Sequence, residues 1–186
     1  MSADSPTATQ TALPTGTWQV DKVHSNVEFQ VKHLGIATVK GHFTDFQGTL
    51  VVGADGASAS GSVKAESVDT REPQRDGHLR SPDFFDAEQF PEITFKSTSI
   101  SPVDEDTFEV VGDFTMHGIT KPLTLTATLE GTETDHEGNP RVGISAAAQI
   151  SRSDWDMKFN MALGSGNVVV SDKVKIILDI SAVKAA

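Results

Sequence analysis

The stretch "TFEVVGDFTMHGITKPLTLTATLEG", residues 107–131, contains two runs of alternating apolar and polar side chains, separated by a turn signal. In the first run the apolar residues from Phe108 to Met116 fall on one face, and in the second the leucines from Leu123 to Leu129 do the same. Such a period of two is typical of β-strands, whose side chains point alternately to opposite faces. One buried face indicates antiparallel strands, because strands covered on both faces read as continuous apolar runs.

The same alternation extends along most of the chain after residue 16. Turn signals rich in Gly, Pro, Asp and Asn separate the runs, as in "GADG" at 53–56 and "DHEGNP" at 135–140. The predicted strands cover residues 17–22, 25–33, 37–53 with a bend at Gly41 or Gly48, 59–67, 92–100, 107–116, 122–131, 141–150 and 172–182. About nine strands with mostly short connections predict an all-β fold, a single antiparallel barrel, and a two-sheet sandwich is the competing arrangement.

The alternation stops in "DTREPQRDGHLRSPDFFDAEQFP", residues 69–91. Ser81 and Pro82 are typical of a helix N-cap and first turn, and Pro91 is expected to end the helix. We therefore predict one short helical connection within residues 69–91. Its two adjacent phenylalanines could turn toward the interior.

The length of 186 residues indicates one domain. Residues 1–16 contain no Lys or Arg and no apolar run, so they are predicted to form a disordered N-terminal tail that precedes a domain at 17–183. The same segment lacks the charged and apolar regions of a secretory signal, which predicts a cytoplasmic location.

Composition argues against several classes of function. The formal charge of -11 disfavours nucleic acid as a partner, and the absence of Cys excludes disulfides and a Cys nucleophile. The six His are not paired at the short spacings of metal sites, so neither a metal nor a cofactor is expected. No G-x-S-x-G, H-E-x-x-H or P-loop motif occurs, which predicts a protein that is not an enzyme.

The interior of the predicted barrel has two interpretations. A barrel of about eight strands can hold one small ligand when its inner side chains do not fill it. Ala146, Ala147 and Ala148 make the strand at 141–150 small, while ten Phe and no Tyr supply aromatic surface without a polar tip. On composition alone an ordinary packed core is favoured over a ligand cavity.

Four stretches together resemble the YceI family, polyisoprenoid-binding, lipocalin-like bacterial proteins. They are "VDKVHSNVEFQVKHLGIATVKGHFTDFQGTL" at 20–50, "HLRSPDFFDAEQFPEITFKS" at 78–97, "GDFTMHGITKPLTL" at 112–125 and "KVKIILDI" at 173–180. The resemblance runs from about Thr17 to Val183. It implies a lipocalin-like barrel around a tunnel that holds a long isoprenoid lipid, such as a polyprenyl phosphate or an isoprenoid quinone.

The resemblance also implies a role without catalysis, namely carriage or sequestration of the lipid, in transport or a stress response. The expected partners are the isoprenoid lipid or another lipophilic small molecule, with possible transient membrane contact and a monomer or homodimer as the assembly. Relatives are often periplasmic or secreted, which contrasts with the cytoplasmic location predicted above.

Candidate ligand-binding residues follow from the inferred inner faces and the predicted helix. They are Val27, Phe29, Val31, Phe43, Phe84, Phe85, Phe95, Phe114, Met116, Trp155 and Phe159, each of which could equally be ordinary core packing. The candidates for a head group are the cations of the matching motifs, His24, Lys32, His33, Arg75, His78 and Arg80. For Arg80 the alternative is a pair with Asp83 or Asp86.

Two other functions remain open at this point. The first is an enzyme that acts on a hydrophobic small molecule through His and carboxylate residues in the same pocket. The second is a structural module with a filled core and a surface partner.

Overall fold

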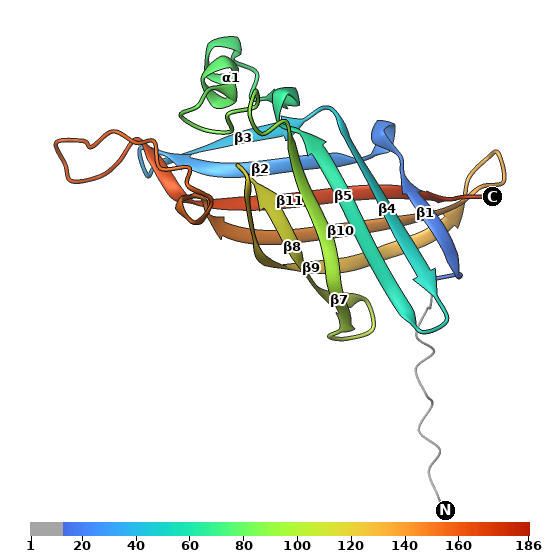
Figure 1. Cartoon of the computed structure of the whole chain (residues 1–186). Coiled ribbons are helices and arrows are strands. Elements are labelled where there is room, and N and C mark those ends of the chain that lie inside the picture. The colour runs from blue at the N-terminus through green and yellow to red at the C-terminus, as the bar shows by residue number, and fades with distance from the viewer. Residues whose placement is uncertain (1–12) are drawn as a thin grey trace, which may run out of the picture.

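The structure is a computed structural model that describes residues 13–186, and most of its elements are antiparallel β-strands (Figure 1). The strands are β1 (Gly16–Val20), β2 (Asn26–His33), β3 (Ala37–Phe43), β4 (Phe46–Gly53), β5 (Gly56–Lys64), β6 (Val68–Asp69), β7 (Glu92–Pro102), β8 (Thr107–Met116), β9 (Ile119–Thr134), β10 (Pro140–Ser151) and β11 (Val170–Lys184). The helical elements are α1 (Pro73–Arg80) and the short 3₁₀-helices η1 (Lys22–His24), η2 (Ala65–Ser67) and η3 (Arg152–Trp155). Within residues 13–186, no helix has the length and apolar character needed to cross a membrane.

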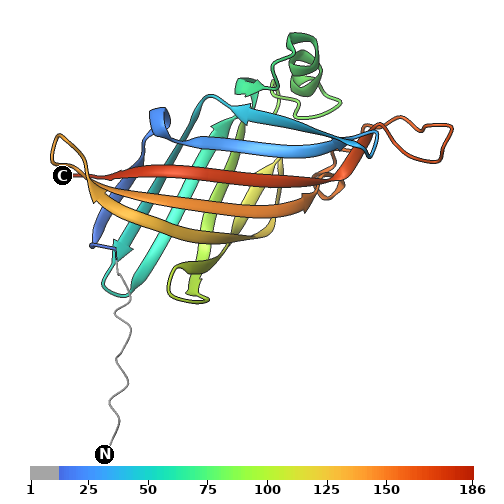
Figure 2. The same ribbon diagram turned by 180° about the vertical axis from the view of Figure 1, so that it is seen from behind.

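Eight strands form a closed barrel, which confirms the predicted fold over the sandwich. Hydrogen-bonded neighbours follow the order β1, β4, β5, β7, β8, β9, β10 and β11, and β11 pairs back onto β1. β11 pairs with β1 near its C-terminus and with β2 along the rest of its length, so β1 and β2 form one side of the ring. Figures 1 and 2 show the strands wrapping around a common interior.

The alternation in residues 107–131 is confirmed in the barrel wall. β8 and β9 pair with Val110 opposite Leu125. Leu123 and Leu125 are buried, whereas Thr124 and Thr126 are exposed. The period of two therefore separates an interior face from an exterior face, as expected for a half-buried strand.

The long strand predicted at 37–53 is divided into β3 and β4, but the bend lies at Thr44 and Asp45. The Thr44 N–H donates to the carbonyl of Ser67, and the Asp45 carbonyl accepts from the N–H of Lys64. These bonds join the bend to the end of β5 and to η2, the segment that links β5 to β6. Pairing with a distant segment therefore sets the position of the bend.

Prediction of the bend at Gly41 or Gly48 was wrong, because these glycines make room for neighbouring side chains. A Cβ at Gly41 would overlap the ring of Phe29, and a Cβ at Gly48 would come within 2.8 Å of Val20 Cγ2. Both glycines therefore allow an inward side chain to lie flat against the wall.

The prediction of a helix that starts at Ser81 was also wrong. The helix of this connection is α1, which ends just before Ser81. It begins after Glu72, whose side chain accepts a hydrogen bond from the N–H of Gln74 at 3.1 Å. Ser81 is instead the C-cap, and its N–H donates to the carbonyl of His78.

After α1, the chain turns back on itself instead of continuing as a helix. The N–H groups of Phe84 and Asp86 both donate to the Ser81 carbonyl, and Asp86 has a φ of 49°. This reversal buries Phe84 and Phe85 together. Both rings then line the cavity of the barrel.

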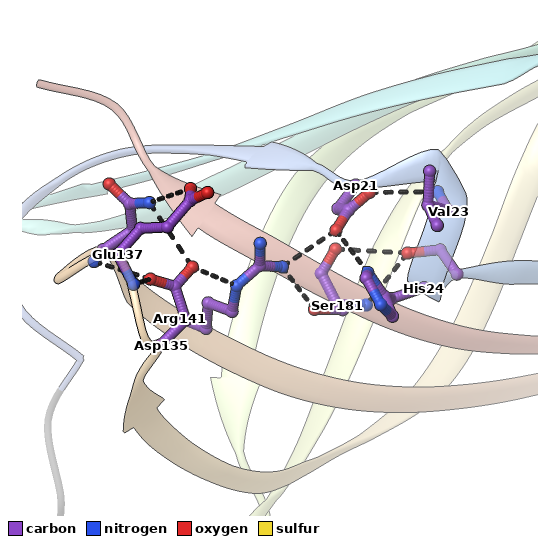
Figure 3. A network of polar contacts seen from close by, with 9 residues as sticks. Asp21, Val23, His24, Asp135, Glu137, Arg141 and Ser181 are labelled. Atoms are coloured by element: carbon purple, nitrogen blue, oxygen red, sulfur yellow. Dashed lines mark hydrogen bonds and ion pairs between the residues drawn. The ribbon is translucent and has the colours of Figure 1, made fainter.

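A network of charged side chains centred on Arg141 lies beside the closure of the ring (Figure 3). Nη1 of Arg141 donates to Asp21 at 2.8 Å, and Nε donates to Asp135 at 2.7 Å. Arg141, together with His24, lowers the pKa of Asp21 to about 2. Arg141 also holds the pKa of Asp135 well below its usual range. The network joins the start of β10 and the β9–β10 turn to the break between β1 and β2.

A serine completes the hydrogen bonding at that break. The hydroxyl of Ser25 donates to the Ser181 carbonyl at 3.1 Å and accepts from the Ser181 N–H at 2.9 Å. The hydroxyl thus takes the place of a backbone partner where β1 ends and β2 has not begun.

We expect the Arg141→Gln variant to have a lower free energy of unfolding at pH 7, because the carboxylates of Asp21 and Asp135 lose their shared cation. The Asp21 contribution is present above its ordinary pKa of 3.8 and is lost as pH falls toward about 2. The difference between variant and wild type should therefore shrink over that range in urea titrations. The control is Lys158→Gln, which removes an exposed pair with Asp156. Equal stability at pH 7, or a difference near pH 2 as large as that at pH 7, contradicts the assigned role.

We expect Gly41→Ala to lower the free energy of unfolding by about 1 to 3 kcal/mol, because the added methyl overlaps the ring of Phe29. The matched control is Gly77→Ala in α1, where a Cβ meets nothing within 4 Å. Ala is favoured over Gly in a helix by roughly 1 kcal/mol, so this control should not destabilise. Thermal and urea unfolding measure both changes, and equal effects of the two variants would show that the ring can move aside freely.

Candidate functional site

The barrel encloses a cavity of about 890 Å³ whose wall is mainly aliphatic and aromatic. This volume lies near the upper end of the range of about 300–1,000 Å³ that is usual for small-molecule pockets. Among the described residues, Glu28, Glu105 and Arg152 supply the formal charges on the lining. An apolar wall of this kind suits a hydrocarbon chain.

The cavity reaches the surface at the end formed by the β4–β5 and β7–β8 turns. Gly53 and Pro102 line it there and are exposed. Beside this opening, Trp18 packs against Val142 and Ala182, and all three are almost fully buried. This cluster fills the remainder of the open end.

The opposite end, next to α1, is closed by aromatic rings. Phe85 lies 6.3 Å from Phe29 and 5.6 Å from Phe43 between ring centroids. Phe84 lies 5.3 Å from Phe159, and Phe84 and Phe85 are only 6% and 8% exposed. The cavity therefore has one open end and one blind end.

Most of the predicted ligand-binding side chains lie on the cavity wall. Those that line it are Val27, Phe29, Val31, Phe43, Phe84, Phe85, Phe95, Phe114 and Met116. Trp155 and Phe159 do not line it. Trp155 lies behind Phe114, to whose carbonyl its indole N–H donates at 3.3 Å, and Phe159 packs behind Phe84.

The predicted head-group residues on β2 and η1 are not on the lining. His24 binds the carboxylate of Asp21 at 2.7 Å, and Lys32 donates to the hydroxyl of Thr38 at 2.8 Å. His33 is exposed at the end of β2. These cations lie on the outside of the barrel.

The predicted head-group residues on α1 are held by their own connection. Arg75 donates to the hydroxyl and the carbonyl of Thr70, both at 2.7 Å. His78 binds Asp83 at 2.8 Å and stacks edge-on against Phe84, with centroids 5.0 Å apart. Neither side chain lines the cavity.

Arg80 does not form the pair with Asp83 or Asp86 that was the alternative to head-group binding. Its Nε donates to the Glu66 carbonyl at 2.8 Å, and its Nη2 donates to the Val68 carbonyl at 3.2 Å. His78 and Gln89 bind the two carboxylates instead. Arg80 therefore fastens α1 to the chain around η2 and also lies off the lining.

Arg152 is the cation that sequence reasoning missed. It is 5% exposed and lines the cavity, and its guanidinium lies 5.9 Å from the centre of the Phe84 ring. Burial lowers the pKa of Arg152, although Asp172 opposes the shift. A signal was available, since Arg152 continues the alternation of the inward residues Ala146 and Ile150.

Groups for acid–base or metal chemistry do not meet in the cavity. The lining includes none of the six histidines. Within residues 13–186, no cluster of three His, Asp or Glu could hold a metal ion.

Comparison with known proteins agrees with this architecture. A family model described as a YceI-like domain matches residues 18–182. Protein YceI of Shigella flexneri is 36% identical over 156 residues, which cover 81% of this chain and 81% of that protein. A UPF0312 protein of Pectobacterium atrosepticum is 36% identical over 148 residues, covering 78% of this chain and 77% of that protein.

Solved structures share the barrel. A YCEI protein of Campylobacter jejuni superimposes with a TM-score of 0.71 at 27% identity, covering 83% of this chain and 90% of that one. BcnA of Burkholderia cenocepacia gives 0.74 at 21% identity, covering 87% and 98%. A polyisoprenoid binding domain from Saccharophagus degradans gives 0.70 at 14% identity, covering 90% and 98%. The matching domain and these relatives show that the chain belongs to the YceI family.

Proposed function

We propose that this protein binds a long isoprenoid lipid in its barrel and carries or sequesters it without chemical change. The observation that carries the proposal is the enclosed cavity of about 890 Å³, with an apolar wall and one open end. A polyprenyl phosphate and an isoprenoid quinone are the two lipid classes that we favour.

The relatives support this choice of ligand. The Saccharophagus degradans domain that shares the fold is a polyisoprenoid binding domain. Its identity to this chain is 14%, so the shared property is the barrel, and the ligand is part of the proposal.

The apolar wall limits which features of a lipid such a site can distinguish. Each buried CH₂ contributes roughly 0.8 kcal/mol, so one additional methylene changes affinity little. A long chain would nominally exceed the ceiling of roughly 18 to 21 kcal/mol for non-covalent binding, and ordering of the chain must offset much of the gain. Selectivity should therefore depend on total length and on the head group.

The competing functions have less support from the same geometry. An enzyme that used His and carboxylate residues in this pocket would need them on the lining, and the histidines lie elsewhere. A structural module with a filled core would have no cavity of this size.

We expect organic extraction of the purified protein, followed by mass spectrometry, to release a long-chain lipid. After delipidation, added polyprenyl phosphate or isoprenoid quinone should raise the thermal midpoint. Ligand at 100 times its dissociation constant should add about 2.7 kcal/mol to the free energy of unfolding. An extract without lipid, together with an unchanged midpoint for both compounds, would remove the proposal.

Ala146 and Ala147 offer a matched pair of variants on β10. Ala146 lines the cavity, whereas Ala147 is exposed on the outside of the barrel. We expect Ala146→Phe to reduce the ligand-induced thermal shift, because the ring occupies the volume that the lipid needs. Ala147→Phe should keep the wild-type shift, and equal shifts for both variants would place binding outside the barrel.

A further inference from the structure

Arg152 brings a positive charge to the blind end of a mainly apolar cavity, on whose lining Glu28 and Glu105 are the other charged residues among those described. Residues from the same end, including Phe84 and Met157, line the cavity beside it and are also buried. In the described part of the chain, the hydrogen bonds of its guanidinium go to backbone carbonyls and none goes to a carboxylate. Asp172 is the opposite charge that acts on Arg152, but it does not accept a hydrogen bond from the guanidinium. A buried charge without a hydrogen-bonded counter-ion is costly, which makes this position unusual for a residue with only a packing role.

The guanidinium of Arg152 also has N–H groups that are not used in these hydrogen bonds. Nε donates to the Ser171 carbonyl at 2.9 Å, Nη1 to the Met157 carbonyl at 2.6 Å and Nη2 to the Val170 carbonyl at 3.2 Å. An arginine has five N–H groups, so two of them have no acceptor among residues 13–186. An oxygen of a bound molecule could accept both.

Building on the proposed function, we propose that the blind end is the head-group site of the lipid, and that Arg152 donates to an oxygen of that head group. The lipid then lies with its head innermost and its hydrocarbon tail directed toward the opening between the β4–β5 and β7–β8 turns. This orientation explains why the predicted head-group cations lie outside the cavity.

The same donors restrict the class of head group. Two N–H groups and one positive charge match a compact head with one or two acceptor oxygens and at most one negative charge, such as a carboxylate or a quinone carbonyl. Of the two lipid classes proposed above, this favours the quinone over the polyprenyl phosphate, whose head has three oxygens and nearly two negative charges. A diphosphate would leave several charged oxygens without partners in apolar surroundings, which is strongly unfavourable.

The two tryptophans of the chain allow a test of this orientation. Trp155 lies in η3 with Arg152 at the blind end, and Trp18 lies in the cluster beside the open end. Their indole N–H groups give separate signals in a proton–nitrogen correlation spectrum, and Trp→Phe variants assign them. The probes are two stearates, one with a nitroxide close to the carboxylate and one with a nitroxide near the methyl end.

We expect the nitroxide near the carboxylate to broaden the Trp155 signal more than the Trp18 signal, and the nitroxide near the methyl end to do the reverse. The opposite pattern, or the same pattern from both probes, overturns the head-inward orientation while leaving lipid binding intact. No broadening by either probe, with no thermal shift for stearate, polyprenyl phosphate or quinone, instead removes the binding function itself.

Substitution tests the contribution of Arg152 separately. Arg152→Gln should weaken stearate binding by about tenfold or more, the scale expected for a charge-assisted hydrogen bond in an apolar site. The control is Arg80→Gln, which also removes hydrogen bonds to backbone carbonyls but lies off the lining and should change affinity less than about twofold.

A prenyl diphosphate should bind wild type more weakly than a carboxylate of similar length, and tighter binding contradicts the compact head. If Arg152→Gln does not fold, the nitroxide comparison on the wild-type protein still decides the orientation.

Discussion

The hydrogen-bonded pairing of β1 with β11 is the constraint on which the rest of the structure depends. It completes the ring, so the backbone groups of the wall find partners in neighbouring strands rather than in anything placed inside. The inward side chains can then leave a cavity without leaving the backbone unsatisfied. The Arg141 network and the Ser25 hydroxyl stabilise the same region, where β1 gives way to β2.

Local sequence was enough to predict the antiparallel strands of the barrel, because period two specifies half-buried strands and a short turn between them specifies antiparallel neighbours, although the same pattern also fits a two-sheet sandwich. It was not enough to place the helix. Ser81 is a preferred N-cap residue and Glu72 is not, so the local capping signal favoured the wrong position, and only the following Pro is common to both. In the structure the chain reverses after α1, and the two phenylalanines that follow are both buried.

The part of the site that is formed by inward residues of the barrel strands was predictable from the sequence. Most of the residues named from the alternation lie on the lining, because an inward residue on a barrel strand faces the cavity by geometry alone. The head-group candidates were chosen because they lie in matching motifs, and proximity in sequence does not show which side of the wall a cation occupies. The alternation that runs from Ala146 through Ile150 to Arg152 carried that information two residues beyond the predicted end of the strand.

Whether a ligand fills the cavity affects how quickly proteases degrade the protein. Side chains around an unfilled apolar space lose the dispersion contacts that a ligand would provide, so the empty wall opens locally more often than the loaded one. Proteases act on such opened forms, and their cleavage follows the population that is open. Turnover in a cell would then remove the unloaded molecules first, and the abundance of the protein would follow the supply of whatever ligand fills the cavity, without a dedicated regulator.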